Sequence, residues 1–255
     1  MRTALFTDLD GTLLFSKRTL PEMLTEKDCF KAESYGNGGY GLMEEKLVVF
    51  FEKWQQDNFL IPVTTRSLEQ FERLEAVWKR LPVPFALTSN GGNLYRDGAL
   101  DAEWNKGIRA ELSEELVHRE AVLAILHVIL PEESVRKIKD IDGLYYCVLV
   151  TERSWSPTFI DEVNAAVAVY DWIGYFQHKK LYFLPKRLTK EYAMKRLRTE
   201  LAEELNCIGL GDTEMDQQML LQCDKHLYFG EPAVPTEELV SYPYSLKAIQ
   251  KILTI

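Results

Sequence analysis

FTDLDGTLL, residues 6–14, is the most informative segment of this chain. A short apolar run leads into it and ends at two carboxylates, Asp8 and Asp10. Such a run is typical of a buried strand in a parallel sheet, and open α/β sheets bind ligands at the carboxyl ends of their strands. Two carboxylates this close repel each other and are costly to bury unless a cation or a proton lies between them. We therefore expect a cation site in this loop.

The composition is that of an ordinary globular protein. The chain has 255 residues, 46% hydrophobic and 27% charged, which suffices for one large domain or two moderate ones. The net charge of -9 argues against a nucleic-acid partner, which would require a basic face. The N-terminus does not resemble a signal peptide, and no apolar run is long enough to span a membrane. We expect a cytoplasmic protein with no membrane partner.

Strand and helix patterns alternate in the first part of the chain. Residues 15–42 are polar and glycine-rich, and we expect an irregular segment there, with residues 34–41 as a loop or flap beside the site. A phosphate-binding role for these glycines lacks the context of a P-loop. The elements expected next are a helix at 43–57, a strand at 59–63, a helix at 67–79 capped by Ser67, and a strand at 84–88. This order predicts parallel strands joined by right-handed crossovers.

The pattern changes between residues 94 and 184. Turn residues at 93–106 precede a helical region at 107–130, and Asp142-Gly143 lies between two apolar runs, which predicts a hairpin. A helix at 156–169 and a second pair of strands, at 172–177 and 181–184, complete an αββαββ unit. The α/β order then resumes, with a helix at 189–205, a strand at 207–210, a helix at 214–222, a strand at 225–229 and a helix at 245–253.

The fold predicted from these patterns is α/β. We expect a Rossmann-like core with an open parallel sheet, formed by residues 1–93 and 185–255, and an inserted α+β cap domain at 94–184. Polar residues follow the core strands or begin the helices after them: Asp8, Asp10, Thr64, Lys190, Asp212 and Asp216. Because the carboxyl ends of parallel strands meet at one edge of a sheet, these side chains should converge.

Four motifs in this order resemble those of the haloacid dehalogenase superfamily of phosphohydrolases. They are DLDGT at 8–12, Thr64 in VTTRS, Lys190 in LTKEYAM, and GDTEMD at 211–216. The insert resembles the type-two cap of sucrose-phosphate phosphatase, mannosyl-3-phosphoglycerate phosphatase, trehalose-phosphate phosphatase and eukaryotic phosphomannomutase. The resemblance implies a Mg²⁺-dependent phosphatase that acts on a small phosphorylated metabolite, with a sugar phosphate favoured.

The resemblance also implies a role for each motif residue. Asp8 would attack phosphorus and form an aspartyl-phosphate, and Asp10 would serve as general acid and base. Mg²⁺ would be held by Asp8, the main-chain carbonyl of Asp10 and Asp212. Asp216 would be a further ligand or would support the site from behind. Thr64, Lys190 and backbone amides near Gly11 would bind the phosphate, with Lys186 the alternative to Lys190.

The sequence departs from the family pattern at two positions, where Thr65 replaces a glycine and Met215 replaces an asparagine. The candidate residues for recognising the leaving group are Arg66, Ser67, Asn90, Lys179, Lys180 and Arg187. Two alternatives stay open, a phosphomutase of the same fold and a non-catalytic protein that binds a phosphorylated ligand. We expect a monomer or a homodimer.

Overall fold

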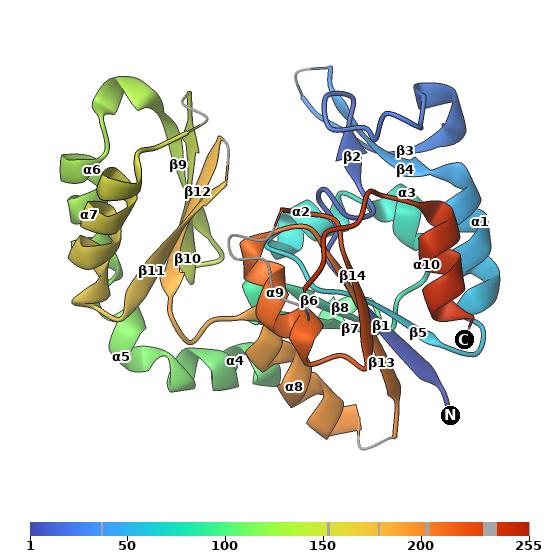
Figure 1. Cartoon of the computed structure of the whole chain (residues 1–255). Coiled ribbons are helices and arrows are strands. Elements are labelled where there is room, and N and C mark those ends of the chain that lie inside the picture. The colour runs from blue at the N-terminus through green and yellow to red at the C-terminus, as the bar shows by residue number, and fades with distance from the viewer. Residues whose placement is uncertain (37, 152–153, 178, 202–203, 232–238, 255) are drawn as a thin grey trace. The chain divides into compact units, whose positions relative to one another are not determined.

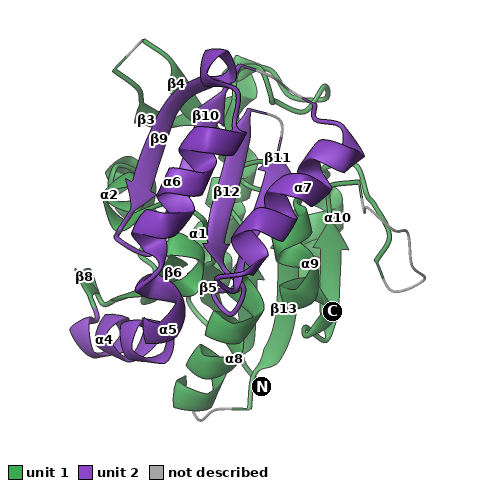
Figure 2. Ribbon diagram, turned by 90° about the vertical axis from the view of Figure 1, so that its left-hand side faces the viewer, with its two compact units in different colours: residues 1–100, 190–255 green, residues 101–189 purple. Residues whose placement is uncertain are grey.

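The computed structural model describes the chain except residues 37, 152–153, 178, 202–203, 232–238 and 255. The described chain forms two compact units (Figures 1 and 2). Unit 1 comprises residues 1–100 and 190–255, and unit 2 comprises residues 101–189. No helix among the described residues is both long enough and apolar enough to cross a membrane.

A parallel sheet organises unit 1. Its strands run in the order β14 (Lys225–Tyr228), β13 (Asn206–Gly211), β1 (Thr3–Thr7) and β5 (Phe59–Pro62). Strand β6 (Phe85–Thr88) continues this order through a parallel bridge between Val63 and Leu87. Each strand is short and apolar, and Leu5 and Phe6 of β1 are fully buried. This confirms the predicted Rossmann-like core.

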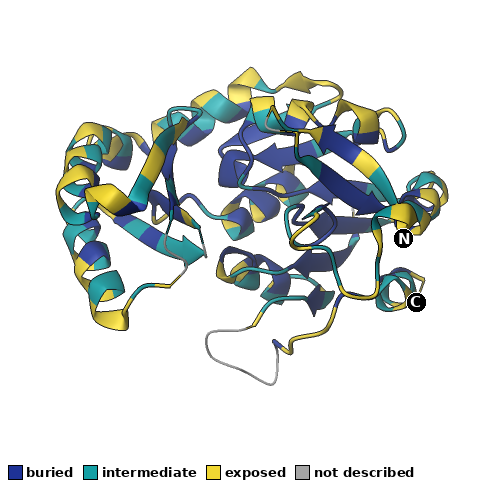
Figure 3. Ribbon diagram, turned by 90° about the horizontal axis from the view of Figure 1, so that it is seen from above, coloured by how far each residue is buried: buried dark blue, intermediate teal, exposed yellow. Residues whose placement is uncertain are grey.

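Helices cover both faces of the parallel sheet (Figures 1 and 3). Helices α1 (Glu45–Trp54) and α10 (Leu246–Leu253) lie on one face. Helices α8 (Lys190–Leu201) and α9 (Glu214–Leu221) lie on the other. Helix α1 is amphipathic, because its apolar residues recur at helical spacing. Its buried residues are Leu47, Val48, Phe51 and Trp54.

The prediction of an irregular segment at 15–42 is wrong. The chain there forms β2 (Phe15–Ser16), a 3-10 turn η1 (Glu26–Asp28), β3 (Cys29–Ser34) and β4 (Tyr40–Glu44). The strands pair antiparallel in the order β2–β4–β3. The glycine-rich residues form the β3–β4 turn, in which the Tyr35 amide donates to the Gly39 carbonyl at 2.7 Å. Helix α1 begins at Glu45 and not at residue 43, because β4 extends to Glu44.

Two further expectations for unit 1 need correction. The helix predicted at 67–79 is divided into α2 (Leu68–Glu72) and α3 (Glu75–Trp78), although Ser67 caps α2 as expected. The segment read as turns contains β7 (Asn93–Arg96) and β8 (Ala99–Leu100), which form an antiparallel sheet with β6. This pairing keeps residues 94–100 in unit 1, so unit 2 begins after the boundary that we expected.

Unit 2 has the predicted αββαββ order. Its helical region comprises α4 (Ala102–Glu111), α5 (Ser113–Leu116) and α6 (Arg119–Ile129), and is followed by η3 (Glu132–Ser134). The remaining elements are β9 (Val135–Ile141), β10 (Tyr145–Val150), α7 (Pro157–Ala168), β11 (Trp172–Gln177) and β12 (Lys180–Pro185). The strands form an antiparallel sheet in the order β11–β12–β10–β9. Helices α6 and α7 cover one face of it (Figure 2).

The hairpin predicted at Asp142-Gly143 is confirmed. Both residues have positive φ, 51° and 66°, in the turn between β9 and β10. Glycine adopts this conformation without strain, and aspartate tolerates it better than most residues. The turn therefore sets the register of the two strands.

A matched pair of substitutions in α1 tests the packing of unit 1. Val48 is fully buried against the sheet, whereas its neighbour Val49 is 41% exposed. We expect Val48→Ala to lower the free energy of unfolding by about 2 kcal/mol, through lost burial and the cavity left behind. Val49→Ala should change it by less than ~0.5 kcal/mol. Urea unfolding measures both, and equal losses would contradict the orientation of α1.

Candidate active site

The acidic loop begins where β1 ends. The Asp8 amide donates to the Leu210 carbonyl of β13 at 2.9 Å, so the parallel pairing carries Asp8 to the edge of the sheet. Asp8 is only 4% exposed. The chain then turns sharply, with the amides of Thr12 and Leu14 donating to the Leu9 carbonyl at 3.2 and 2.7 Å. The sheet and the turn together hold a buried carboxylate at the carboxyl end of the strand.

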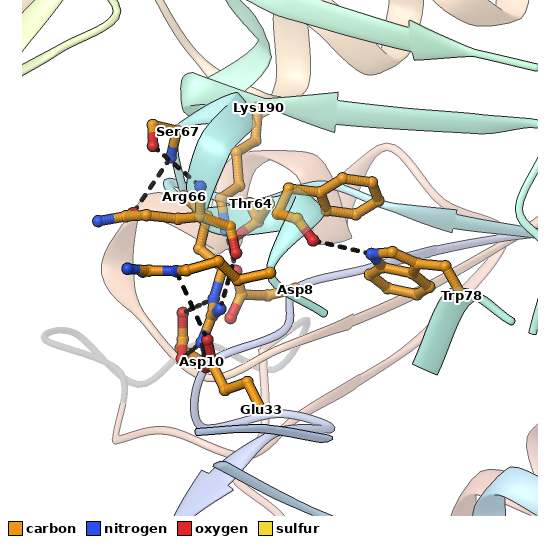
Figure 4. A network of polar contacts seen from close by, with 11 residues as sticks. Asp8, Asp10, Glu33, Thr64, Arg66, Ser67, Trp78 and Lys190 are labelled. Carbon is orange, nitrogen blue, oxygen red and sulfur yellow. Dashed lines mark hydrogen bonds and ion pairs between the residues drawn. The ribbon is translucent and has the colours of Figure 1, made fainter. Parts of the chain in front are cut away.

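Lys190, the first residue of α8, is the buried cation of this site (Figure 4). Its Nζ lies 2.5 Å from Asp8 Oδ1 and 2.6 Å from Asp216 Oδ1, and its side chain is 1% exposed. Burial by itself lowers the pKa of Lys190. The nearby Asp216 and Asp8 carboxylates raise it by more, so the pKa lies above its ordinary value. The ammonium therefore stays charged. The alternative, Lys186, belongs to unit 2, where its Nζ lies 3.7 Å from Asp171 Oδ1.

Asp216 supports the site through both of its carboxylate oxygens. Oδ1 accepts from Lys190, while Oδ2 accepts from the amides of Asp212 and Thr213 at 3.2 and 2.9 Å and from the Thr213 hydroxyl at 2.8 Å. The bond from the Thr213 amide is part of the capping box at the start of α9. Of the two roles that we considered for Asp216, this arrangement favours support over direct coordination of a metal.

Asp8, Asp212 and Asp216 each offer a carboxylate oxygen, and these atoms lie within 4.8 Å of one another. Burial raises the pKa of Asp8 to about 7, against the opposing charge of Lys190. Burial, with the charges of Asp8 and Asp216, raises the pKa of Asp212 to about 9. The single ammonium in contact with these carboxylates does not neutralise them, and the excess negative charge opposes ionisation.

The residues present fit a magnesium ion. Asp8 Oδ2 and Asp212 Oδ2 make no hydrogen bond or ion pair to the part of the chain that the structure describes. Carboxylate oxygens are the ligands that Mg²⁺ prefers, and its charge would balance the excess of acid. Asp8 and Asp212 would hold the ion. The side chain of Asp10 lies outside the cluster, so this residue could contribute only its main-chain carbonyl.

We predicted that backbone amides near Gly11 would bind the phosphate. In the structure, Gly11 leaves space for the side chain of Asp212. The Gly11 amide donates to the Leu14 carbonyl at 2.9 Å and is used within the turn. Its φ is +96°, and a Cβ there would lie 2.1 Å from Asp212 Oδ2. Thr12 beside it donates from its hydroxyl to Asp212 Oδ1 at 3.0 Å. The turn can thus approach the second carboxylate only because residue 11 has no side chain.

Asp10 is held by Arg66 in a bidentate ion pair (Figure 4). Arg66 Nε donates to Asp10 Oδ2 at 2.7 Å, and Nη2 donates to Asp10 Oδ1 at 2.8 Å. Nη2 also donates to Glu33 Oε1 at 2.6 Å. We predicted Arg66 as a substrate contact, but the structure places its guanidinium on these two acids.

The other candidates in unit 1 support the ends of the strands. Thr64 is fully buried, and its hydroxyl accepts from the Arg66 amide at 3.1 Å. The main-chain amide of Asn90 donates to the Thr64 carbonyl at 2.9 Å, and Asn90 is 2% exposed. Ser67 accepts from the Gln70 amide at 3.2 Å as the cap of α2. These contacts position the loop after β5, and a direct role in substrate binding remains a prediction for all three.

The candidates in unit 2 differ in how they are engaged. Arg187 donates to both oxygens of Glu115 at 2.5 and 2.8 Å and to the Glu111 carbonyl, so it ties the end of β12 to the helical region. Lys179 is half-buried, and Lys180, at the start of β12, is exposed. Lys179 and Lys180 lie by the turn between β11 and β12, and their role in specificity remains a prediction.

Sequence reasoning missed two residues of this site, Thr12 and Glu33. Thr12 belongs to the first motif, but nothing in the sequence indicates that its hydroxyl reaches Asp212. Glu33 lies in the segment that we expected to be irregular. A signal was available there, because a short glycine-rich loop between two stretches that carry apolar residues is typical of a hairpin.

The pKa shifts predict how pH affects the metal-free protein. Folded Asp8 and Asp212 keep protons up to about pH 7 and about pH 9, whereas an unfolded aspartate releases its proton near pH 4. The folded state then binds more protons than the unfolded state, so stability should fall as pH rises across this window. Mg²⁺ should restore it, with a larger rise in Tm at high pH than at low pH.

Thermal unfolding in EDTA and in excess Mg²⁺, across this pH range, measures the effect. Asp212→Asn is the matched variant, because it removes one titrating group and one proposed ligand at nearly constant volume. It should flatten both the pH dependence and the Mg²⁺ response. An Mg²⁺-induced rise in Tm that is equal at all pH values, or that persists in Asp212→Asn, would contradict this account.

Comparison with known proteins locates the fold. The sequence matches no family model and no curated protein, but many solved structures match. The sucrose-phosphatase of Synechocystis, solved with sucrose and phosphate, has a TM-score of 0.66 at 18% identity and covers 98% of both chains. Trehalose-6-phosphate phosphatase from Aspergillus fumigatus has a TM-score of 0.53 at 12% identity, covering 99% of this chain and 92% of that one.

A third structure, a sugar phosphatase of haloacid dehalogenase subclass IIB, has a TM-score of 0.56 at 13% identity. It covers 89% of this chain and 86% of its own. At such identities the likeness concerns the fold, and this chain likewise has a parallel core and an inserted α+β unit. The chain therefore has the fold of the haloacid dehalogenase superfamily, as the four motifs predicted.

Proposed function

We propose that the protein is a Mg²⁺-dependent phosphatase that hydrolyses a small phosphorylated metabolite through an aspartyl-phosphate. One observation carries the proposal: the buried Asp8 carboxylate, at the end of β1, is held by Lys190 beside Asp212. It combines a nucleophile, a fixed cation and a second acid in one place, which are the parts that phosphoryl transfer requires. Asp10, two residues after Asp8, adds an acid–base group.

In the first step Asp8 attacks phosphorus. An oxygen of its carboxylate forms the new bond to phosphorus, and the bond from phosphorus to the ester oxygen breaks. Asp10 gives a proton to the departing oxygen, so the alcohol leaves neutral. Lys190 holds Asp8 Oδ1 at 2.5 Å and thereby limits rotation of the attacking carboxylate.

In the second step water releases the phosphate. The ionised Asp10 takes a proton from the water, whose oxygen attacks phosphorus and breaks the bond to Asp8. Asp10 is then protonated for the next cycle, and one of its two bonds from Arg66 must open for it to carry and donate that proton. The Lys190 ammonium and the Thr64 hydroxyl would bind phosphoryl oxygens in both steps, and the bound magnesium ion would neutralise their charge.

We infer a sugar phosphate as the substrate class. The solved structures of similar fold include the sucrose-phosphatase, the trehalose-6-phosphate phosphatase and the subclass IIB sugar phosphatase. Proteins of one fold can act on different substrates, so this likeness supports the class and not an individual sugar. The inserted domain, unit 2 at residues 101–189, would contact the sugar, with the half-buried Lys179 and the exposed Lys180 as candidate contacts.

The assignment of Asp8 is tested by Asp8→Asn. Removing the nucleophile should abolish the hydrolysis of p-nitrophenyl phosphate in Mg²⁺, by at least ~10³-fold, because an amide cannot form the intermediate. Release of p-nitrophenol measures the rate. Circular dichroism shows whether the variant is folded, and turnover at the wild-type rate would overturn the assignment.

The products distinguish hydrolysis from a mutase reaction. A phosphatase releases inorganic phosphate and free sugar in equal amounts, whereas a mutase returns the phosphoryl group to the sugar and forms an isomeric sugar phosphate. We expect the first outcome in a screen of sugar phosphates with Mg²⁺. Phosphate release and ³¹P NMR of the products measure it. An isomerised sugar phosphate without free phosphate would support the alternative that the sequence left open.

A further inference from the structure

Strand β3 directs a glutamate into the protein interior. Its pairing with β4 shifts register between Lys31 and Glu33, which interrupts the usual alternation of inward and outward side chains. Ala32 and Glu33 are therefore both buried, at 1% and 6% exposure. Opposite Glu33 lies Gly41, where a Cβ would be 3.1 Å from Glu33 Cγ and 3.2 Å from Oε1. The irregular pairing and the glycine together make room for an acidic side chain.

A carboxylate in this position is costly unless a cation accompanies it. The Glu33 side chain is 1% exposed, and Oε1 accepts from Arg66 Nη2 at 2.6 Å. Oε2 makes no hydrogen bond to the described residues and lies 4.0 Å from Arg73 Nε. Arg66 is thus its close partner, and the pair joins the β2–β4–β3 sheet to the loop after β5.

The Arg66 guanidinium is fixed from three elements. It donates to Asp10 in the loop after β1, to Glu33 in β3 and, through Nη1, to the Gln70 carbonyl of α2 at 3.2 Å. A free arginine side chain samples many rotamers, and each of these bonds reduces that freedom. Asp10, by contrast, has a side chain that is 37% exposed. Arg66 donates to both oxygens of this half-exposed carboxylate and so fixes its orientation.

We propose that Glu33 is a positioning residue, which holds Arg66 so that Arg66 in turn holds the Asp10 carboxylate toward the leaving group. The inference rests on the proposed phosphatase function. Proton donation depends steeply on distance and direction, and misplacement by about 1 Å costs as much as ~10²-fold in rate. The irregular pairing of β3 with β4, which buries Glu33, would then serve the protonation of the leaving group and not the attack by Asp8.

The dependence on the leaving group tests this proposal. Phenyl phosphate and p-nitrophenyl phosphate have similar shapes, but the phenolate of the first is the more basic and requires a proton to depart. We expect Glu33→Ala to lower kcat/KM, which reports the steps up to departure of the phenol, by at least ~10-fold for phenyl phosphate and by less than ~3-fold for p-nitrophenyl phosphate. Glu33→Gln, which keeps the size and one acceptor oxygen, should lie between Glu33→Ala and wild type on phenyl phosphate.

Glu44→Gln is the matched control. Glu44 is a buried acid of the same sheet, 5% exposed, but its partner is the Tyr244 hydroxyl at 2.8 Å and not Arg66. This variant should change both rates by the same factor. The rise of Tm in Mg²⁺ should be unchanged in all three variants, because Asp8 and Asp212 are not altered. Equal effects of Glu33→Ala on the two esters, no effect, or faster turnover of phenyl phosphate would overturn the proposal.

Failure of the proposed function would look different. If the wild-type protein hydrolyses neither ester in Mg²⁺, the phosphatase assignment fails. Crystal structures of the wild type and of Glu33→Ala then decide the positioning itself. The proposal expects that Arg66 loses its two bonds to Asp10 in Glu33→Ala. Retention of both bonds would overturn it.

Discussion

The buried ammonium of Lys190 is the interaction on which the rest of the site depends. It contacts Asp8 and Asp216 at 2.5 and 2.6 Å, at a depth where an unpaired carboxylate would be strongly destabilised. Burial raises the pKa values of Asp8 and Asp212, and the negative charge that one ammonium leaves uncompensated raises them further. The same imbalance that disfavours the metal-free site is what would attract a divalent cation and, through it, a phosphate.

Tertiary pairing explains how these acids meet. Strands β1 and β13 are far apart in sequence, yet Leu5 pairs with Ile208, so the loops that follow both strands lie at one edge of the sheet. Gly11 allows the first loop to approach Asp212, and the capping box of α9 directs Asp216 toward Lys190. The pairing of strands supplies the proximity, while one glycine and one helix cap determine which oxygen atoms face the site.

The β2–β4–β3 sheet shows the limit of reading the sequence by periodicity. The register shift beside Glu33 breaks the alternation that would identify a buried strand. The β7–β8 hairpin was missed because β7 (NLYR) begins and ends with a polar residue and β8 has only two residues. Where an apolar run is uninterrupted, as in β1, β5 and β10, the predicted and observed strands agree.

The main strands and helices of the parallel core, the αββαββ insert and the residues of the four motifs could be predicted from the sequence, because hydrophobic period and motif spacing are local properties. The sequence also placed Lys190 ahead of Lys186, from the motif alone. Three contacts could be seen only in the folded chain: Arg66 binds Asp10 and Glu33, Asp216 binds Lys190 and the helix cap, and Gly11 gives room to Asp212. Those outcomes depend on contacts between distant segments, which no local pattern records.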